Sequence, residues 1–250
     1  MTKPAPVVRL RPSERVWVTG DVHLAPGDEG RVRFFLDFLA AARTEADRLV
    51  VLGDLFDYWI GARHAEACAY RPVLAALRAA TSEGFPVDFV PGNRDFLGPD
   101  ELESVGLSVY GDRVVYEREG VRTLVTHGDL LVSGDRSYQR YRRVVRSGCF
   151  SLLYGIVPVA VRVFVAERLR GVSQRKLGKV EPYAFAVDVR KSEAWLRAHD
   201  AQEVLMGHLH REEVHAHPGE RRTRMLPGWS DGRAPYFELG PAAVLRFYPD

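Results

Sequence analysis

The feature of this 250-residue chain that most restricts its fold is a series of five short apolar runs, each ending in a polar cluster. Each run has four or five residues and is rich in valine and other apolar residues, which is typical of a short strand. The clusters combine glycine with aspartate, asparagine or histidine. The runs are residues 16–19, 48–52, 87–90, 123–126 and 203–206, and the clusters are residues 20–23, 53–57, 92–95, 127–129 and 207–210.

The segments between these runs predict an α/β fold. Residues 31–46 and 65–82 carry apolar side chains at helical spacing, so strands and helices alternate along the chain. A tail of short strands is expected at residues 213–216, 223–226, 236–239 and 243–248. Because no flexible linker or internal repeat divides the sequence, we predict one domain over residues 1–250, with residues 135–180 as an inserted helical cap.

The polar clusters are expected to meet in one crevice, because ligands of open α/β sheets gather outside the carboxyl ends of the strands. Asp21 and His23 are two residues apart, a spacing that places both side chains on one face of an extended segment. His208 and His210 repeat this spacing in the last cluster. Two such pairs would face a shared site.

Carboxylate, imidazole and amide groups in these clusters predict a metal site. Together with the two pairs, Asp54, Asn93 and His127 supply enough ligands for two divalent ions if one carboxylate bridges them. The set contains no thiolate, and it suits Mn²⁺, Mg²⁺, Fe²⁺ or Zn²⁺. Taken alone, an Asp-x-His or a Gly-Asp after a strand is often a simple turn. The repetition at five strand ends favours the metal interpretation.

The remaining histidines serve as an internal comparison. None of them follows a glycine at a strand end, and the second His-x-His lies in the middle of a predicted strand. Solvent-facing or structural roles are expected for His64, His199, His215 and His217.

The ordered series Asp-x-His, Gly-Asp-Leu-Phe-Asp, Gly-Asn-Arg-Asp, His-Gly-Asp and Gly-His-x-His resembles the calcineurin-like metallophosphoesterases. That resemblance implies a four-layer sandwich, with two mixed β-sheets flanked by helices. It also implies two metal positions that share Asp54 as a bridge. One would be held by Asp21, His23, Asp54 and His210, and the other by Asp54, Asn93, His127 and His208.

A finer resemblance rests on Arg94, which stands where most family members have histidine, and on the segments 53–61 and 92–97 and the pair Tyr138 and Gln139. These features are similar to the UDP-2,3-diacylglucosamine pyrophosphatases of lipid A synthesis. Such enzymes use Mn²⁺ to hydrolyse a lipid-bearing UDP-sugar to UMP and 2,3-diacylglucosamine 1-phosphate (lipid X), at the cytoplasmic face of the inner membrane.

This resemblance assigns roles to individual residues. The implied catalytic residues are Asp54, Asn93, Arg94 and His127, and the implied substrate-binding residues are Asn93, Arg94, Asp135, Tyr138, Ser173, Lys179 and His208. Asp57, Asp95 and Asp129 are expected to orient the histidines and Arg94. The chain departs from the family pattern after Ser173, since Leu177 stands at the position of an expected asparagine and Lys179 fits only with a shift.

Charge is concentrated in the predicted insertion. Residues 136–179 hold eleven lysines or arginines and one acid, so their formal charge is +10, whereas the rest of the chain carries −8. The apolar stretch 149–166 contains Arg162 and is a poor membrane span. By the resemblance, the insertion would hold acyl chains, while its first arginines, including Arg142, would face phosphate or lipid headgroups. In the alternative interpretation, an apolar helical pair packs on the main domain beside a solvated basic face.

Localisation and partners follow from the same observations. The isolated Cys68 and Cys149 suit a reducing cytosol, and residues 1–12 lack a signal-peptide pattern. We therefore expect a cytoplasmic protein, peripheral on the cytoplasmic face of the inner membrane. Its expected partners are a lipid-linked UDP-sugar and the membrane surface, with no nucleic acid and no obligate protein partner.

Two rival functions remain at this stage. A phosphoesterase acting on another phosphodiester or nucleotide, such as a nuclease, would use the same metal site without any lipid. A non-catalytic protein of this fold typically loses one or more metal ligands, and none is missing from this sequence. Arg94 bears on the first rival, because a guanidinium cannot donate a proton at neutral pH and so suits a leaving group that departs as a phosphate.

Overall fold

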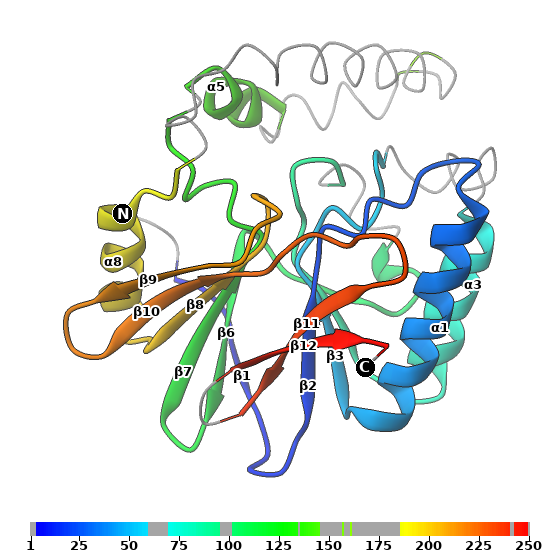
Figure 1. The fold of residues 1–250 in the computed structure, drawn as a ribbon, viewed down its shortest axis with the longest axis horizontal. Coiled ribbons are helices and arrows are strands. Elements are labelled where there is room, and N and C mark those ends of the chain that lie inside the picture. The colour runs from blue at the N-terminus through cyan, green and yellow to red at the C-terminus, as the bar shows by residue number, and fades with distance from the viewer. Residues whose placement is uncertain are drawn as a thin grey trace.

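A computed structural model describes residues 4–59, 70–95, 102–134, 136–145, 157, 161, 186–240 and 243–249. Within these ranges, two mixed six-stranded sheets face each other (Figure 1). The first sheet has the order β12 (Val244–Tyr248), β11 (Ala234–Leu239), β2 (Val16–Thr19), β3 (Arg48–Val51), β4 (Val87–Phe89) and β5 (Ser108–Val109). The second has the order β1 (Val7–Arg9), β6 (Arg113–Arg118), β7 (Val121–Thr126), β8 (Glu203–Met206), β10 (Arg221–Met225) and β9 (Glu213–His217).

Helices cover the outer faces of both sheets (Figure 1). α1 (Glu29–Glu45) and α3 (Arg71–Ser82) pack on the first sheet, and α8 (Val189–Ala198) packs on the second. The four layers confirm the predicted sandwich. α5 (Arg136–Val145) lies beyond the strand ends and begins the predicted insertion.

Alternation along the strands produces the layers. In β2, Val16 and Val18 belong to the core between the sheets, whereas Trp17 packs with the helices on the outer face. β3 repeats the pattern, with Val50 in the inter-sheet core and Leu49 against the helices. Because both faces are covered, residues 16–18 of β2 and 49–51 of β3 are all apolar, which is why each strand appears in the sequence as a hydrophobic run.

The five predicted runs all form strands, and they divide between the two sheets. β2, β3 and β4 are parallel neighbours in the first sheet, and β7 and β8 are parallel neighbours in the second. The crevice therefore forms where the strand ends of two facing sheets meet, not at the edge of one open sheet. Sequence patterns did not predict β1, β5, β6 or α8.

Two expectations fall partly outside the described residues. The predicted helix over residues 65–82 is described only as α3, and the predicted cap over residues 135–180 is described only at α5 and at residues 157 and 161. No helix within the described ranges has the length and apolar character that crossing a bilayer requires.

A buried polar network joins the two sheets away from the strand-end clusters. Tyr116 of β6 donates its hydroxyl to Asp88 Oδ2 of β4 at 2.6 Å, and Arg48 Nη1 of β3 donates to the same oxygen at 2.9 Å. Arg48 Nε also donates to Glu14 Oε1 at 3.0 Å. Asp88 and Tyr116 are fully buried, so the carboxylate depends on these partners for its charge to be tolerated.

Replacing Asp88 with alanine should lower the free energy of unfolding by about 3–5 kcal/mol, because it leaves the half-buried Arg48 guanidinium without its second carboxylate. Tyr116→Phe is the matched control, since it removes one hydrogen bond to a charged group and should cost less, about 1.5–3 kcal/mol. Urea unfolding of the three proteins measures both values. A loss below about 1 kcal/mol for Asp88→Ala would show that the network does not hold the sheets together.

Candidate metal centre

The strand ends bring all seven predicted metal ligands together. The loops after β2, β3 and β4 supply four of them, and the loops after β7 and β8 supply the other three. In chain order the ligands are Asp21, His23, Asp54, Asn93, His127, His208 and His210.

Left-handed backbone conformations produce this convergence. Asp21, His23, Asp54, His208 and His210 have φ values of 54°, 52°, 48°, 74° and 53°. The expectation that each pair lies on one face of an extended segment is therefore wrong, since the strands end before these residues. A left-handed conformation costs a residue with a side chain about 1–2 kcal/mol, and such strain clusters at functional sites.

Hydrogen bonds between neighbouring loops hold these conformations. The backbone N–H of Asp21 donates to Gly53 O at 3.1 Å, and that of His23 donates to Asp54 O at 2.9 Å. In addition, the backbone N–H of His208 donates to Asp21 Oδ2 at 2.7 Å. The loops of the two sheets thus fix one another at the point where the ligands meet.

Four side chains form the first ligand group. His23 Nε2 lies 3.0 Å from His210 Nε2, and His210 Nε2 lies 3.4 Å from Asp21 Oδ1. Asp54 Oδ2 is 3.9 Å from His23 Nε2. These atoms surround one small volume and all can offer a lone pair.

The second ligand group lies on the other side of Asp54. His127 Nε2 is 3.0 Å from Asn93 Oδ1 and 3.8 Å from Asp54 Oδ1. His208 Nδ1 is 2.8 Å from Asn93 Oδ1 and 3.2 Å from His127 Nε2. Asp54 therefore presents one oxygen to each group, as a bridging carboxylate would.

Two glycines leave room for the carboxylates. A Cβ atom on Gly92 would lie 2.3 Å from Asp54 Oδ1, and a Cβ atom on Gly207 would lie 2.3 Å from Asp21 Oδ2. Both distances are far below van der Waals contact. Any side chain at either position would push a carboxylate out of the ligand cluster.

The donor set fits divalent cations. Asp21 Oδ1 is buried and accepts no hydrogen bond. His127 Nδ1 donates to Leu52 O at 2.7 Å, so in the neutral ring the lone pair of Nε2 points toward the ligand cluster. A buried carboxylate oxygen without a donor and imidazole nitrogens aimed at one another are the features that a bound cation would satisfy.

Protonation states support the same conclusion. Burial and the nearby Arg94 cation lower the pKa of His23 to about 3, and burial together with His127 lowers the pKa of His208 to about 4. Both rings are therefore neutral at physiological pH, which is the form that binds metal. Burial, with the neighbouring carboxylates of Asp95 and Asp21, raises the pKa of Asp54 to about 7 without a cation. A divalent ion beside Asp54 would oppose this shift and keep its carboxylate charged.

Arg94 lies beside the ligands and is held in place by acids. Its Nη1 atom donates to Asp57 Oδ1 at 2.6 Å, and its backbone N–H donates to Asp54 Oδ1 at 2.9 Å. Its Nε atom is 3.5 Å from Asp54 Oδ2. The structure therefore places Asp57 as expected, against the guanidinium.

Asp95 and Asp129 have partners other than those expected. Asp95 accepts from the backbone N–H groups of Leu55 and Gly92, at 2.7 and 2.8 Å, so it fixes the loops that carry Asp54 and Asn93 rather than a histidine or Arg94. Asp129 accepts from Tyr138 and Arg142, while His127 is oriented by a backbone carbonyl.

Arg142 also corrects an expectation. Its side chain is buried against Asp129 and Asp112 instead of facing phosphate or lipid headgroups. Asp112 lies in the short turn between β5 and β6, and its pairing with Arg142 carries no sequence signal beyond a common Gly-Asp dipeptide.

The other residues singled out in the sequence are the remaining predicted substrate contacts and the histidines expected to lie outside the site. Tyr138 lies near the second ligand group, with its ring centroid 6.3 Å from that of His208. Asp135, Ser173, Lys179 and His64 lie outside the described residues. Three other histidines stand away from the cluster: His199 bonds Trp195 O, His215 pairs with Glu213, and the buried His217 bonds Thr223.

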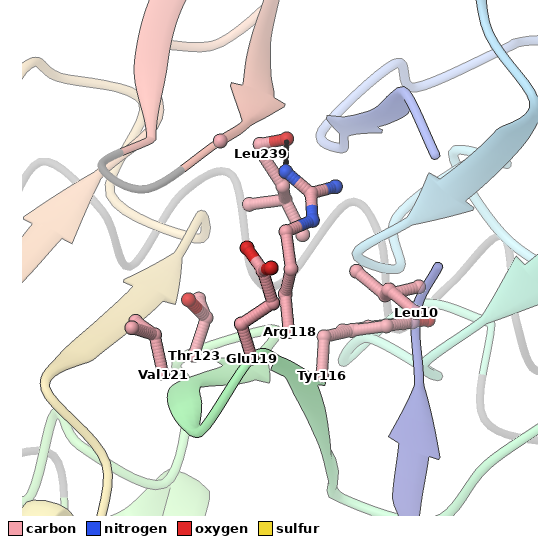
Figure 2. A pocket seen from close by; sticks show the side chains of 8 residues that line it. Leu10, Tyr116, Arg118, Glu119, Val121, Thr123 and Leu239 are labelled. Atoms are coloured by element: carbon pink, nitrogen blue, oxygen red, sulfur yellow. Dashed lines mark hydrogen bonds between the residues drawn. The ribbon is translucent and has the colours of Figure 1, made fainter. Parts of the chain in front are cut away.

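A separate small cavity of about 60 Å³ lies at the β6–β7 turn (Figure 2). Arg118 crosses it, and its Nη1 atom donates to Leu239 O at 2.8 Å. Because this turn is at the opposite end of β7 from His127, the cavity is distinct from the ligand cluster.

Comparison with known proteins identifies the family. The family model described as calcineurin-like phosphoesterase matches residues 14–212. A UDP-2,3-diacylglucosamine hydrolase from Edwardsiella ictaluri is 36% identical over 78% of this chain and 75% of its own length, and one from Aeromonas hydrophila subsp. hydrophila is 34% identical over 90% and 92%. The crystal structure of a dimetal phosphatase from Danio rerio, at 14% identity, has the same fold, with a TM-score of 0.54 over 94% of this chain and 96% of its own. The chain therefore belongs to the calcineurin-like phosphoesterase family.

Proposed function

We propose that this chain hydrolyses the pyrophosphate of UDP-2,3-diacylglucosamine, giving UMP and 2,3-diacylglucosamine 1-phosphate. The observation that carries the proposal is its similarity, at 34–36% identity over most of the chain, to relatives named for hydrolysis of that compound. The ligand cluster supports it, because all seven predicted metal-ligating side chains are present and lie together.

Two divalent ions, most suitably Mn²⁺, would be held by the two ligand groups with Asp54 between them. Carboxylate, imidazole and amide donors suit this ion. When bound, such a pair supplies an activated water and neutralises the charge of phosphoryl oxygens. The chain's own contribution is the rigid frame: buried carboxylates, neutral imidazoles, and loops bonded to each other so that little reorganisation is needed.

Arg94 gives the site its preference for pyrophosphate. Held by Asp57, its guanidinium stays charged and presents hydrogen-bond donors beside Asp54, where a phosphate would lie. It cannot protonate a leaving group. A leaving group that departs as a phosphate needs no proton, whereas an alkoxide does, so this site favours pyrophosphate cleavage over hydrolysis of ordinary phosphomonoesters.

The other assigned roles complete the proposal. Asn93 and His127 act with Asp54 and Arg94 in catalysis, and Tyr138 and His208 contact the substrate. Asp135, Ser173 and Lys179 remain predicted substrate contacts. The insertion over residues 135–180 would hold the acyl chains at the cytoplasmic face of the inner membrane, within the single domain 1–250.

Incubating the purified chain with UDP-2,3-diacylglucosamine and Mn²⁺ should release UMP, because attack on the pyrophosphate separates the nucleoside monophosphate from the lipid-bearing phosphate. Mass spectrometry of the nucleotide product distinguishes UMP from UDP. Release of UDP, or turnover of soluble phosphodiesters alone, would contradict the proposed function.

Asp54→Ala should abolish turnover and lower bound metal at both positions, since one carboxylate oxygen faces each ligand group. Metal content per chain, measured by inductively coupled plasma mass spectrometry, tests the bridge. His215→Ala is the matched control and should keep full metal content. Retention of two ions by Asp54→Ala would refute the bridging assignment.

Arg94→Ala should reduce kcat by about 10²–10³-fold, as removal of a charge-stabilising donor does in other enzymes, while metal content stays unchanged. Arg94→His tests the leaving-group argument, because an imidazole can donate a proton. Its ratio of phosphomonoester to pyrophosphate hydrolysis should rise above that of the wild type. An unchanged ratio would mean that Arg94 does not set the preference.

A further inference from the structure

The first helix of the predicted insertion, α5, is hydrogen-bonded to the loop that follows the predicted metal ligand His127. Arg142 of α5 donates from Nε to Asp129 Oδ2 at 2.6 Å, and its Nη2 atom bonds Asp112 Oδ1. Asp129 is buried and Arg142 is nearly so. This arginine therefore joins α5 to the loop before β6 and to the loop after β7, which lie at the same end of this antiparallel pair.

The same helix makes further contacts with that loop. Tyr138 donates its hydroxyl to Asp129 Oδ2 at 2.6 Å, the oxygen that Arg142 Nε also contacts. The Gln139 amide donates to the backbone carbonyls of Asp129 at 2.7 Å and Val132 at 3.1 Å. One carboxylate oxygen thus holds both the tyrosine and the arginine, one turn apart on α5.

This arrangement fixes the place of the Tyr138 ring. The ring lies 6.3 Å from the His208 ring between centroids, with an interplanar angle of 32°. His208 in turn contacts Asn93 and His127 in the second ligand group. A chain of neighbouring side chains therefore leads from the buried arginine to the second ligand group.

We propose that Arg142 is a positioning residue: by fixing Asp129 it holds the Tyr138 ring beside His208, and so sets how tightly the site binds its nucleotide-sugar substrate. This rests on the proposed function for the identity of the substrate. Arg142 reaches none of the metal ligands in the described structure, so its effect passes through Asp129 and Tyr138. Affinity for the large substrate should depend on it, and the metal chemistry should not.

Arg142→Met tests the proposal by removing the guanidinium and keeping an apolar stem of similar length. We expect KM for UDP-2,3-diacylglucosamine to rise about tenfold, with kcat and Mn²⁺ content little changed, because only an interaction that orients substrate is lost. Hydrolysis of bis-p-nitrophenyl phosphate, which carries neither sugar nor nucleotide, should stay within about twofold of wild type. Arg78→Met, on the exposed face of α3, is the matched control for loss of a helical arginine.

A double-mutant cycle separates positioning from a purely structural role. Tyr138→Phe keeps the ring but loses the hydroxyl bond to Asp129, so it should raise KM by itself. If Arg142 acts through Tyr138, the combined variant should be no worse than the worse single one, since coupled residues are not additive. Arg142→Lys keeps the charge without the planar fork and should give an intermediate KM.

Multiplicative effects on KM in the double variant would overturn the proposal, as would a parallel loss of activity on both substrates with an early melting transition. If Arg142→Met does not fold, Tyr138→Phe and Arg142→Lys still test the same contacts, and unchanged KM in both would overturn it. Failure of the proposed function appears differently, as no turnover of UDP-2,3-diacylglucosamine by wild type. Crystal structures of wild type and Arg142→Lys then show whether the Tyr138 ring leaves His208, and an unmoved ring would overturn the positioning role.

Discussion

Two buried carboxylates at the ends of adjacent parallel strands are the constraint on which this structure depends. Asp21 and Asp54 are only 1% and 2% exposed, and both stand in left-handed backbone conformations. Removing a carboxylate from water costs several kcal/mol even after the protein relaxes, which is a large share of the 5–15 kcal/mol that stabilise a typical domain. Without a cation, burial raises the pKa of Asp54 to about 7, whereas at Asp21 burial is outweighed by the neighbouring histidines, which lower the pKa of that carboxyl to about 2. Asp54 is therefore the carboxylate whose negative charge most needs a cation from outside the chain.

The two sheets hold the halves of this site in register. Asp21 and Asp54 follow strands of the first sheet. His127 and His208 follow strands of the second. Bonds cross between them at the strand ends: His127 donates to Leu52 O, and the His208 backbone donates to Asp21. Because the inter-sheet core is packed with alternating valines and leucines, the separation of the strand ends is fixed by the side chains beneath them.

The sequence predicted the parts of the molecule that share one repeated pattern, an apolar run followed by a polar cluster. Buried strands and polar clusters are local patterns, so the sequence identified all five site strands and the seven side chains that meet at their ends. Conformation at the ligands could not, because a left-handed Asp21 or His23 looks the same in sequence as an extended one. Pairings between distant segments were also hidden. Arg142 stands among eleven basic residues, and only the fold shows that Asp129 and Asp112 take up its charge.

The loop that begins at His127 is held from two directions. On one side, Tyr138, Gln139 and Arg142 contact it from α5. On the other side, where the chain returns, Asp188 donates its backbone N–H to Leu131 O and accepts from Ser133, and Lys191 Nζ donates to Leu130 O. A loop held from two directions gives its metal ligand little freedom. The predicted metal ligand His127 therefore belongs to a rigid frame, and that frame depends on Tyr138, Gln139 and Arg142 keeping the bonds by which α5 holds the loop.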